Sequence, residues 1–367
     1  SGSSLKYRNY DIEFHPYKFD MSGISSSVGV NNAALTSNSF IYMADISQDQ
    51  NMSYHLNGAI AAQGYDSSTL SNFVDGCYAK PISLSINKSY TLGSEMHQFL
   101  YKNTDGIGTI HTNATDNNAT TATILLGTND FNKSNNGVTN TTLNMNFDRN
   151  QTIFMNPKKI TFTTYNSACT TPGNCTMKAD LTEHVADGNV TLDNNVTHYY
   201  GKTHAGRQRF EVPTDNPYRS NIYYEVFCYG TIGTNTCTPS LLQGFPNNLR
   251  RTDDARWYIN PNHNTSRDGN VSSVTQNNAS VVTTSNLVNA TTTTIDHAYT
   301  GTSFPYKTTM DISTSNWLLY NKYSDTINVN QYPVEFEKAG TGWSGEHETN
   351  TTTVDTATVK TNRRSMW

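Results

Sequence analysis

Ile222-Tyr-Tyr-Glu-Val-Phe-Cys228 places an apolar residue at every second position, the pattern of a β-strand with one buried face. The same alternation recurs at Ile82 to Ile86, Leu143 to Phe147, Ile160 to Phe162, Ile327 to Val329 and Val334 to Phe336. No apolar stripe with helical spacing lasts beyond about two turns, and the best candidate for a helix is the short stretch Pro239 to Arg251. The sequence therefore predicts an all-β protein.

Turn signals separate the expected strands. Asn57-Gly58, Asn136-Gly137, Asp187-Gly188 and Asp268-Gly269 supply the positive φ angles that tight hairpins need. The crossover helices that parallel strands require are missing from the pattern, so we expect antiparallel pairing.

A chain of 367 residues has room for two or three domains, each with its own core. We expect tandem antiparallel β-sandwich domains of immunoglobulin-like type with long Asn/Thr-rich loops; the two stretches richest in Asn and Thr, 103–123 and 262–294, are expected to be such loops or weak strands. The expected division is an N-terminal sandwich at 1–160, a disulfide-containing junction at 161–195 and a C-terminal sandwich at 196–367.

The composition narrows the class of protein. Hydrophobic residues make up 35% and charged residues 15%, and Asn, Thr, Ser and Gly dominate the rest, which fits neither a cytosolic enzyme nor a charged disordered chain. The net charge is −5 and no basic cluster exceeds Arg250-Arg251 or Arg363-Arg364, so we expect no nucleic-acid partner. No run of 18 apolar residues occurs, so we expect no direct membrane span.

Four of the five cysteines form two close pairs, Cys169 with Cys175 and Cys228 with Cys237. Each pair could close a short loop as a disulfide, which contributes roughly 2 to 3 kcal/mol in the chain-entropy model. The spacings miss the Cys-x2-4-Cys pattern of zinc sites, so two disulfides are predicted. Cys77 is left over; we interpret it as a buried free thiol, with intermolecular pairing as the alternative.

Asn-x-Ser/Thr sequons, which mark exposed loops of exported proteins when they carry glycan, occur fifteen times. Eight have an acidic residue two positions before the Asn, where bacterial oligosaccharyltransferases of the campylobacterial type require one. Asp and Glu are 30 of 367 residues, so chance places an acid before about one sequon in twelve. The alternative is turn chemistry, because Asp and Asn both bond to the nearby backbone. The predicted glycosylation sites are Asn51, Asn118, Asn132, Asn150, Asn189, Asn195, Asn270 and Asn350.

One segment concentrates ionisable residues. It carries His198, His204, Arg207 and Arg209, and a second segment with Asp253, Asp254, Arg256 and Trp257, followed by His263, could complement it. Such a cluster could bind an anionic sugar or a metal. The alternative is that arginine–carboxylate pairs pin two segments together.

Other candidates for chemistry are weaker. Glu346-His347-Glu348 would set two carboxylates roughly 7 Å apart on one face of a strand, within the range of inverting glycosidases, but this tripeptide ends in a sequon typical of exposed surface. The Asp/Asn-rich turns could hold structural calcium, yet none has EF-hand spacing. Phosphate loops and G-x-S-x-G elbows are absent, so the sequence predicts no catalytic residue, no cofactor and no enzyme.

Six short patterns occur in order: Phe14-His-Pro16-Tyr-Lys-Phe19, Phe40-Ile-Tyr42-Met43, Cys169 to Cys175, Tyr199-Tyr200-Gly201-Lys202, Tyr223-Tyr224-Glu-Val-Phe-Cys228 and Trp317-Leu-Leu-Tyr320. Together they resemble the C-terminal region of large surface proteins encoded with MSHA-type type IV pili, and more closely the long surface proteins of Campylobacterota that end as Asn362 to Trp367 does here. This chain differs from the pilus-associated pattern at Lys202, where Arg is usual. The resemblance implies a secreted, β-rich, pilus-associated or adhesin-like role.

We therefore expect a non-enzymatic, glycosylated structural or adhesive component of a surface filament, located outside the cell. Its expected partners are other surface or filament subunits, including a second copy of the chain, and cell-surface glycans. The alternatives are a carbohydrate-binding adhesin module, for which Trp257 and Trp343 would line a groove, and a secreted glycoside hydrolase.

Overall fold

The computed structural model describes residues 16–36, 38–80, 82–88, 98–103, 106–111, 121–149, 154–160, 162–163, 178–180, 196–232, 235–242, 245, 255–276, 280–283, 290–319 and 330–339. Strands dominate these residues. The one α-helix among them, α1 (Thr265–Asp268), has a single turn. The fold is all-β, as the sequence predicts. None of the helices in the described part of the chain is long and apolar enough to cross a membrane.

The N-terminal half contains a six-stranded sheet, in the order β2 (Ala33–Ala34), β1 (Lys18–Val28), β4 (Tyr54–Gln63), β9 (Val138–Phe147), β6 (Phe99–Asn103) and β7 (Gly106–His111). A second sheet has the order β11 (Phe162–Thr163), β5 (Ile82–Lys88) and β12 (Lys178–Asp180), with β8 (Thr121–Leu126) also paired to β5. The two sheets meet where β1 contacts β12 and where β7 contacts β8.

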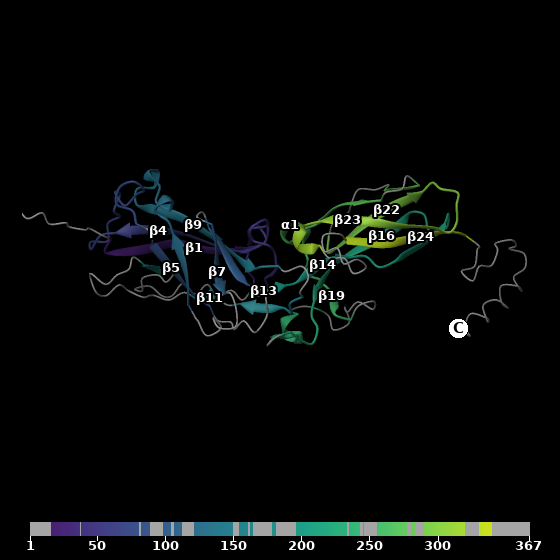
Figure 1. Ribbon diagram of the computed structural model, residues 1–367, viewed down its shortest axis with the longest axis horizontal. Helices are drawn as coiled ribbons and strands as arrows, with labels where there is room; N and C mark the ends of the chain where they lie inside the picture. The colour runs from purple at the N-terminus through teal and green to yellow at the C-terminus, as the bar shows by residue number, and fades with distance from the viewer. Residues whose placement is uncertain are drawn as a thin grey trace, which may run out of the picture.

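A three-stranded sheet lies between the halves, in the order β10 (Lys158–Ile160), β13 (Val196–Tyr199) and β3 (Phe40–Tyr42). Tyr200 follows β13 directly, and the next strand, β14 (Gly201–His204), belongs to the C-terminal half. The chain therefore enters the C-terminal half at Tyr200, between β13 and β14, which Figure 1 shows near the middle of the molecule.

The C-terminal half has two larger sheets. The first has the order β14, β16 (Tyr218–Phe227), β22 (Thr292–Tyr299) and β21 (Val281–Thr283), with β19 (Trp257–Ile259) also paired to β16. The second has the order β15 (Gln208–Val212), β24 (Asn330–Lys338), β23 (Tyr306–Thr314) and β20 (Val271–Thr275). A small hairpin joins β17 (Thr231–Ile232) to β18 (Asn235–Thr236). Figure 1 shows the two halves side by side along the long axis of the molecule.

The expectation of antiparallel pairing is wrong for three strand pairs. β12 with β5, β13 with β3, and β15 with β24 are parallel. Parallel partners need a long connection between them, and here other strands of the fold provide it. No crossover helix is required.

β16 explains why one stretch of sequence indicates the fold. Ile222, Tyr224 and Val226 are fully buried on one face, as the alternation predicts. Near its end, β16 is buried on both faces, because the Phe227 ring stacks on Phe154. The Phe227 N–H also donates to the Tyr200 carbonyl. At the expected helix, the structure has a 3-10 turn, Pro239–Leu241, and most of residues 243–251 lie outside the described residues.

One hydrophobic core runs through both halves, from Val28 to Phe336. Its middle is aromatic and includes Tyr42, Tyr200 and Trp257, each fully buried. Gly201 lies against the Tyr42 ring so closely that a Cβ there would overlap it. Close packing between the halves therefore requires glycine at this position.

Candidate functional site

A buried hydrogen-bond network joins the two halves, and we call it the central junction (Tyr42, Tyr224, Asn260, His263 and Thr293). The Tyr42 hydroxyl lies 3.0 Å from His263 Nδ1 and accepts a hydrogen bond from Asn260 Nδ2 at 3.0 Å. The His263 ring stacks on Tyr224 with 3.5 Å between ring centroids, and the Tyr224 hydroxyl lies 2.6 Å from Thr293 Oγ1. Residues more than 200 positions apart thus share one polar cluster.

The partners of His263 determine its protonation. Its Nε2 lies 3.0 Å from the Gly269 carbonyl, which can only accept, so Nε2 carries the proton and Nδ1 accepts from the Tyr42 hydroxyl. Burial lowers the pKa of His263 to about 3. A histidine held neutral with both nitrogens hydrogen-bonded is suited to fixing a structure.

Two arginines add to the contact between the halves. Arg149 follows β9 and donates from Nη2 to the carbonyls of Gly201, at 2.8 Å, and Leu319, at 3.1 Å. Its guanidinium also lies 4.0 Å from the centre of the Tyr200 ring. Arg267 lies over the Phe40 ring at 4.6 Å and pairs with the buried carboxylate of Asp268. Both guanidinium groups therefore bind other groups of the protein itself.

The predicted ionisable cluster is divided between different surroundings. His198 is fully buried in β13 and meets the rings of Phe99 and Phe147 edge to face. Burial lowers its pKa to about 3. His204 is buried in β14, where it pairs with Tyr223 across to β16. Neither histidine is exposed to solvent in this structure.

Arg207 and Arg209 form ion pairs across to β24. Arg207 pairs with Glu335 and Arg209 pairs with Glu337. Lys307 on β23 lies 3.4 Å from Glu335, so this carboxylate has two cationic partners. These contacts are arginine–carboxylate pairs, as in the alternative interpretation, but the carboxylates belong to β24. Asp253 and Asp254 lie outside the described residues.

Trp257 is fully buried, which contradicts its expected place in an exposed groove. The Lys202 ammonium lies 4.1 Å from the centre of the Trp257 ring and 3.5 Å from the Glu225 carboxylate, and both charged side chains are 1% exposed. Arg256 lies over the Phe154 ring. Aromatic faces and an opposite charge together compensate for the burial of Lys202. Trp343 lies outside the described residues.

Three of the eight predicted glycosylation sites are described, and each Asn is exposed: Asn51, Asn132 and Asn270. Asn118, Asn150, Asn189, Asn195 and Asn350 lie outside the described residues, as does Glu346-His347-Glu348. Two of the preceding acids make local contacts: Asp130 accepts from the Gly127 N–H, and Asp268 accepts from the Asn264 N–H. Asp49 accepts instead from Asn316, which is distant in the sequence. Turn chemistry thus accounts for part of the Asp-x-Asn pattern, whether or not glycan is present.

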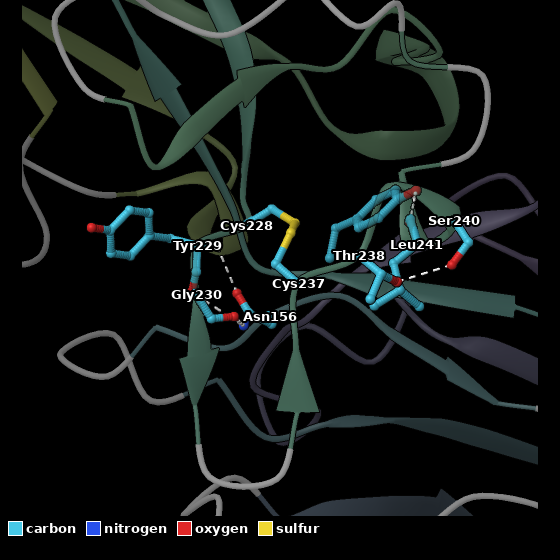
Figure 2. The surroundings of a disulfide bond; sticks show 9 residues. Asn156, Cys228, Tyr229, Gly230, Cys237, Thr238, Ser240 and Leu241 are labelled. Carbon is cyan, nitrogen blue, oxygen red and sulfur yellow. Dashed lines mark hydrogen bonds between the residues drawn. A yellow bond between two sulfur atoms is a disulfide. The ribbon is translucent and has the colours of Figure 1, made fainter.

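The Cys228–Cys237 disulfide is formed, with 5.3 Å between the Cα atoms (Figure 2). Asn156 lies beside it and holds the loop: its Oδ1 accepts from the Tyr229 N–H and its Nδ2 donates to the Gly230 carbonyl. Cys77 is free and exposed, so the expectation that it is buried is wrong. It lies in a tight turn in which its N–H donates to the Val74 carbonyl. Cys169 and Cys175 lie outside the described residues.

A polar hollow of about 360 Å³ opens at the edge between the halves, lined by Asp45, Gln48, Asp49, Arg149, Asn316, Trp317 and Leu319. Burial and the nearby Asp45 raise the pKa of Asp49, against the hydrogen bond from Asn316. Within the described part of the chain, no group of three or more His, Cys, Asp or Glu side chains could hold a metal ion.

Sequence reasoning missed a cluster of exposed tyrosines, Tyr17, Tyr65 and Tyr78. The signal available was local: Tyr65 stands between Gly64 and Asp66-Ser67-Ser68, and an aromatic residue inside a turn sequence has no strand face on which to be buried.

Comparison with known proteins gives no family. No family model matches the chain, and no curated protein matches it. A crystal structure of dimeric latent PorU from Porphyromonas gingivalis aligns with 88% of this chain at 9% identity, with a TM-score of 0.14. The chain spans 24% of the length of that protein.

Proposed function

We propose that this chain is a non-enzymatic, glycosylated extracellular protein, a structural or adhesive component of a surface filament or of a pilus-associated surface protein. The observation that carries the proposal is the Cys228–Cys237 disulfide, because disulfides persist in oxidising compartments and are rare in the cytosol. The exposed asparagines of the three described acidic sequons agree with export. Other surface or filament subunits, the chain itself and cell-surface glycans are its proposed partners.

The use of the ionisable residues supports a non-enzymatic role. His198 and His263 are buried and neutral, Arg207 and Arg209 pair with carboxylates of β24, and Lys202 pairs with Glu225. Catalytic acids and bases need access to a substrate. The two histidines and Lys202 face protein atoms instead.

We also propose that the C-terminal half is an immunoglobulin-like sandwich. Lettering β14, β16, β20, β21, β22, β23 and β24 as A to G makes the first sheet A-B-E-D, and the second sheet G-F-C with β15 added beside G. This is the strand order of immunoglobulin constant-type domains. The six-stranded sheet and the sheet containing β5 would form the other sandwich, which gives a tandem arrangement.

Glycosylation at Asn270 would have to precede folding of the surrounding segment. Asp268, the acid of this sequon, is fully buried and bound to Arg267 and the Asn264 N–H. An enzyme that recognises this carboxylate would have to act before α1 folds.

The test is to shear filaments from the source cells, separate them from membranes, and search both fractions by mass spectrometry for this chain and for mass additions at its acidic sequons. We expect the chain with the filaments and glycan at several of these asparagines. Recovery from the cytosol, with reduced cysteines and unmodified asparagines, would contradict the proposal.

The second candidate is a carbohydrate-binding adhesin module. Trp257 cannot line a groove because it is buried. The exposed tyrosines at the far end of the N-terminal half keep this candidate open.

A further inference from the structure

An aromatic hollow of about 490 Å³ lies at the end of β4, lined by Pro16, Tyr17, Gly64, Tyr65, Leu70, Asn72, Phe73 and Tyr78. Three of its tyrosines are exposed, Tyr17 by 45%, Tyr65 by 83% and Tyr78 by 53%. Among the described residues only two other large hydrophobic side chains, Ile107 and Tyr229, are comparably exposed. Exposed apolar side chains gathered round one hollow mark a binding site more often than exposed apolar side chains scattered singly.

Backbone hydrogen bonds fix the walls of this hollow. The Tyr17 N–H donates to the Gln63 carbonyl at 2.9 Å, which ties the first wall to β4. The Gly64 N–H donates to the Ser68 carbonyl, and Asp66 Oδ1 accepts from the Ser68 N–H at 3.0 Å, which closes the turn that carries Tyr65. The hollow is therefore formed before any ligand arrives, which lowers the entropic cost of binding.

The floor of the hollow belongs to the core. Phe73 is 3% exposed and packs edge to face against Phe131, with 4.9 Å between ring centroids. Phe19 of β1 packs on Phe73 at 5.6 Å. The hollow thus has a packed apolar floor, with phenol hydroxyls and the Asn72 amide as polar groups of its lining.

The lining decides the chemistry of the ligand. No residue of the lining is charged, so the hollow offers no ionic partner to a charged ligand. The Tyr17 and Tyr65 rings meet at 75° with 5.0 Å between centroids, which makes a corner instead of two parallel ridges. A corner accepts one compact ring, whereas a proline-rich peptide needs an extended aromatic groove. A pyranose ring has an apolar C–H face for a tyrosine and hydroxyls for the amide and phenols.

We propose that this hollow binds a neutral saccharide, with a pyranose ring against Tyr65 and Tyr17 and its hydroxyls bonded to Asn72 and Tyr78. Its volume falls within the range of small-molecule sites. The inference rests on the proposed surface role, because it supplies the ligand class for adhesion. β4 lies toward the end of the molecule opposite β24 (Figure 1).

The experiment is binding of the full chain to an array of neutral and acidic glycans, followed by titration of the best neutral ligand. We expect Tyr65→Ala to weaken binding by about tenfold or more, since buried aromatic anchors dominate interface energies. Tyr65→Phe should retain most of the affinity because it keeps the ring. Tyr229→Ala, at another tyrosine that is 55% exposed, is the matched control and should bind as the native chain does.

A second variant distinguishes loss of binding from loss of folding. Asn72→Trp would fill the hollow without removing a core contact, since Asn72 is exposed, and it should abolish binding while thermal unfolding stays unchanged. Binding of neutral glycans by the Tyr65→Ala and Asn72→Trp variants at native affinity would overturn the proposal. So would preference for acidic glycans or for a proline-rich peptide, or the absence of any glycan binding.

The chain's own segment 1–15 is the competing occupant, because it directly precedes Pro16 of the lining. Glycan binding by a variant that lacks this segment, with none by the full chain, would assign the hollow to that segment. Cell fractionation tests the surface role separately, so failure of saccharide binding is distinguishable from failure of the proposed function.

Discussion

Three buried histidines make this chain sensitive to acid. Burial lowers the pKa of His198 and His263 to about 3 and that of His297 to about 4. In the unfolded chain each would bind a proton near pH 6.5, so the unfolded state binds more protons as the pH falls below that value. The stability is fully present above pH 6.5 and is lost progressively toward pH 3 to 4.

We expect the free energy of unfolding to decrease between pH 6 and pH 4 by about 1.4 kcal/mol per pH unit for each histidine. Urea unfolding at several pH values measures it. His198→Leu removes one titrating group and should reduce the slope by about a third. An unfolding free energy that is constant from pH 7 to pH 4.5 would contradict the buried neutral state.

Single side chains also show where sequence reasoning ends. The alternation at Ile222, Tyr224 and Val226 is correctly predicted because a strand with one buried face leaves a period of two in its own sequence. The burial of Trp257 is not predictable in this way. Its neighbours Phe154 and Lys202 come from segments more than 50 residues away, and no local pattern indicates that they meet.

At the level of strand pairs, the ion pair between β14 and β16 is the contact whose disruption by mutation should cost most. Lys202 and Glu225 are direct partners in the antiparallel register, and both are buried. Removing one member leaves the other charge buried without compensation, which costs about 3 to 5 kcal/mol.

Lys202→Met should therefore destabilise the chain by that amount, and Glu225→Leu should do the same. The double variant should recover most of the loss, because apolar residues of similar volume can replace a buried pair. Chemical unfolding of the four proteins gives the coupling energy. Additive losses in the double variant would show that the two charges do not interact.

The disulfide closes a short segment at the end of β16. It links residues nine positions apart, for which the chain-entropy model gives about 2 to 3 kcal/mol. The double variant Cys228→Ala/Cys237→Ala should lose this amount, while Asn156 still holds Tyr229 and Gly230 in place. Unfolding with and without reductant measures the effect in the native chain. A change below about 0.5 kcal/mol would mean that the unfolded loop is already constrained.

Pairing between strands is less predictable than the strands themselves. The positions of β5, β9 and β16 follow from alternation in the sequence. The parallel pairs do not, because β13 meets β3 across more than 150 residues, and β15 meets β24 across more than 100. The sequence contains strand propensity at each place and no record of the partner.

The two halves share one core and a polar junction, so we expect them to unfold together. All four tryptophans lie at position 257 or later, so tryptophan fluorescence reports on the C-terminal half and, through Trp257 and Trp317, on its contact with the N-terminal half. Far-UV circular dichroism reports on the strands of both halves. In the native chain the two signals should change at the same urea concentration. Transitions at different concentrations would show that the continuous core does not couple the halves.

Arg149→Met tests which contacts provide this coupling. The substitution removes the hydrogen bonds to the Gly201 and Leu319 carbonyls, and bonds from a charged donor contribute about 1.5 to 3 kcal/mol each. We expect the fluorescence and dichroism transitions to separate. Arg207→Met, at an arginine whose side chain is 59% exposed, is the matched control and should leave them coincident. If both variants unfold in one step, the aromatic packing of Tyr42 on Gly201, and not the arginine, holds the halves together.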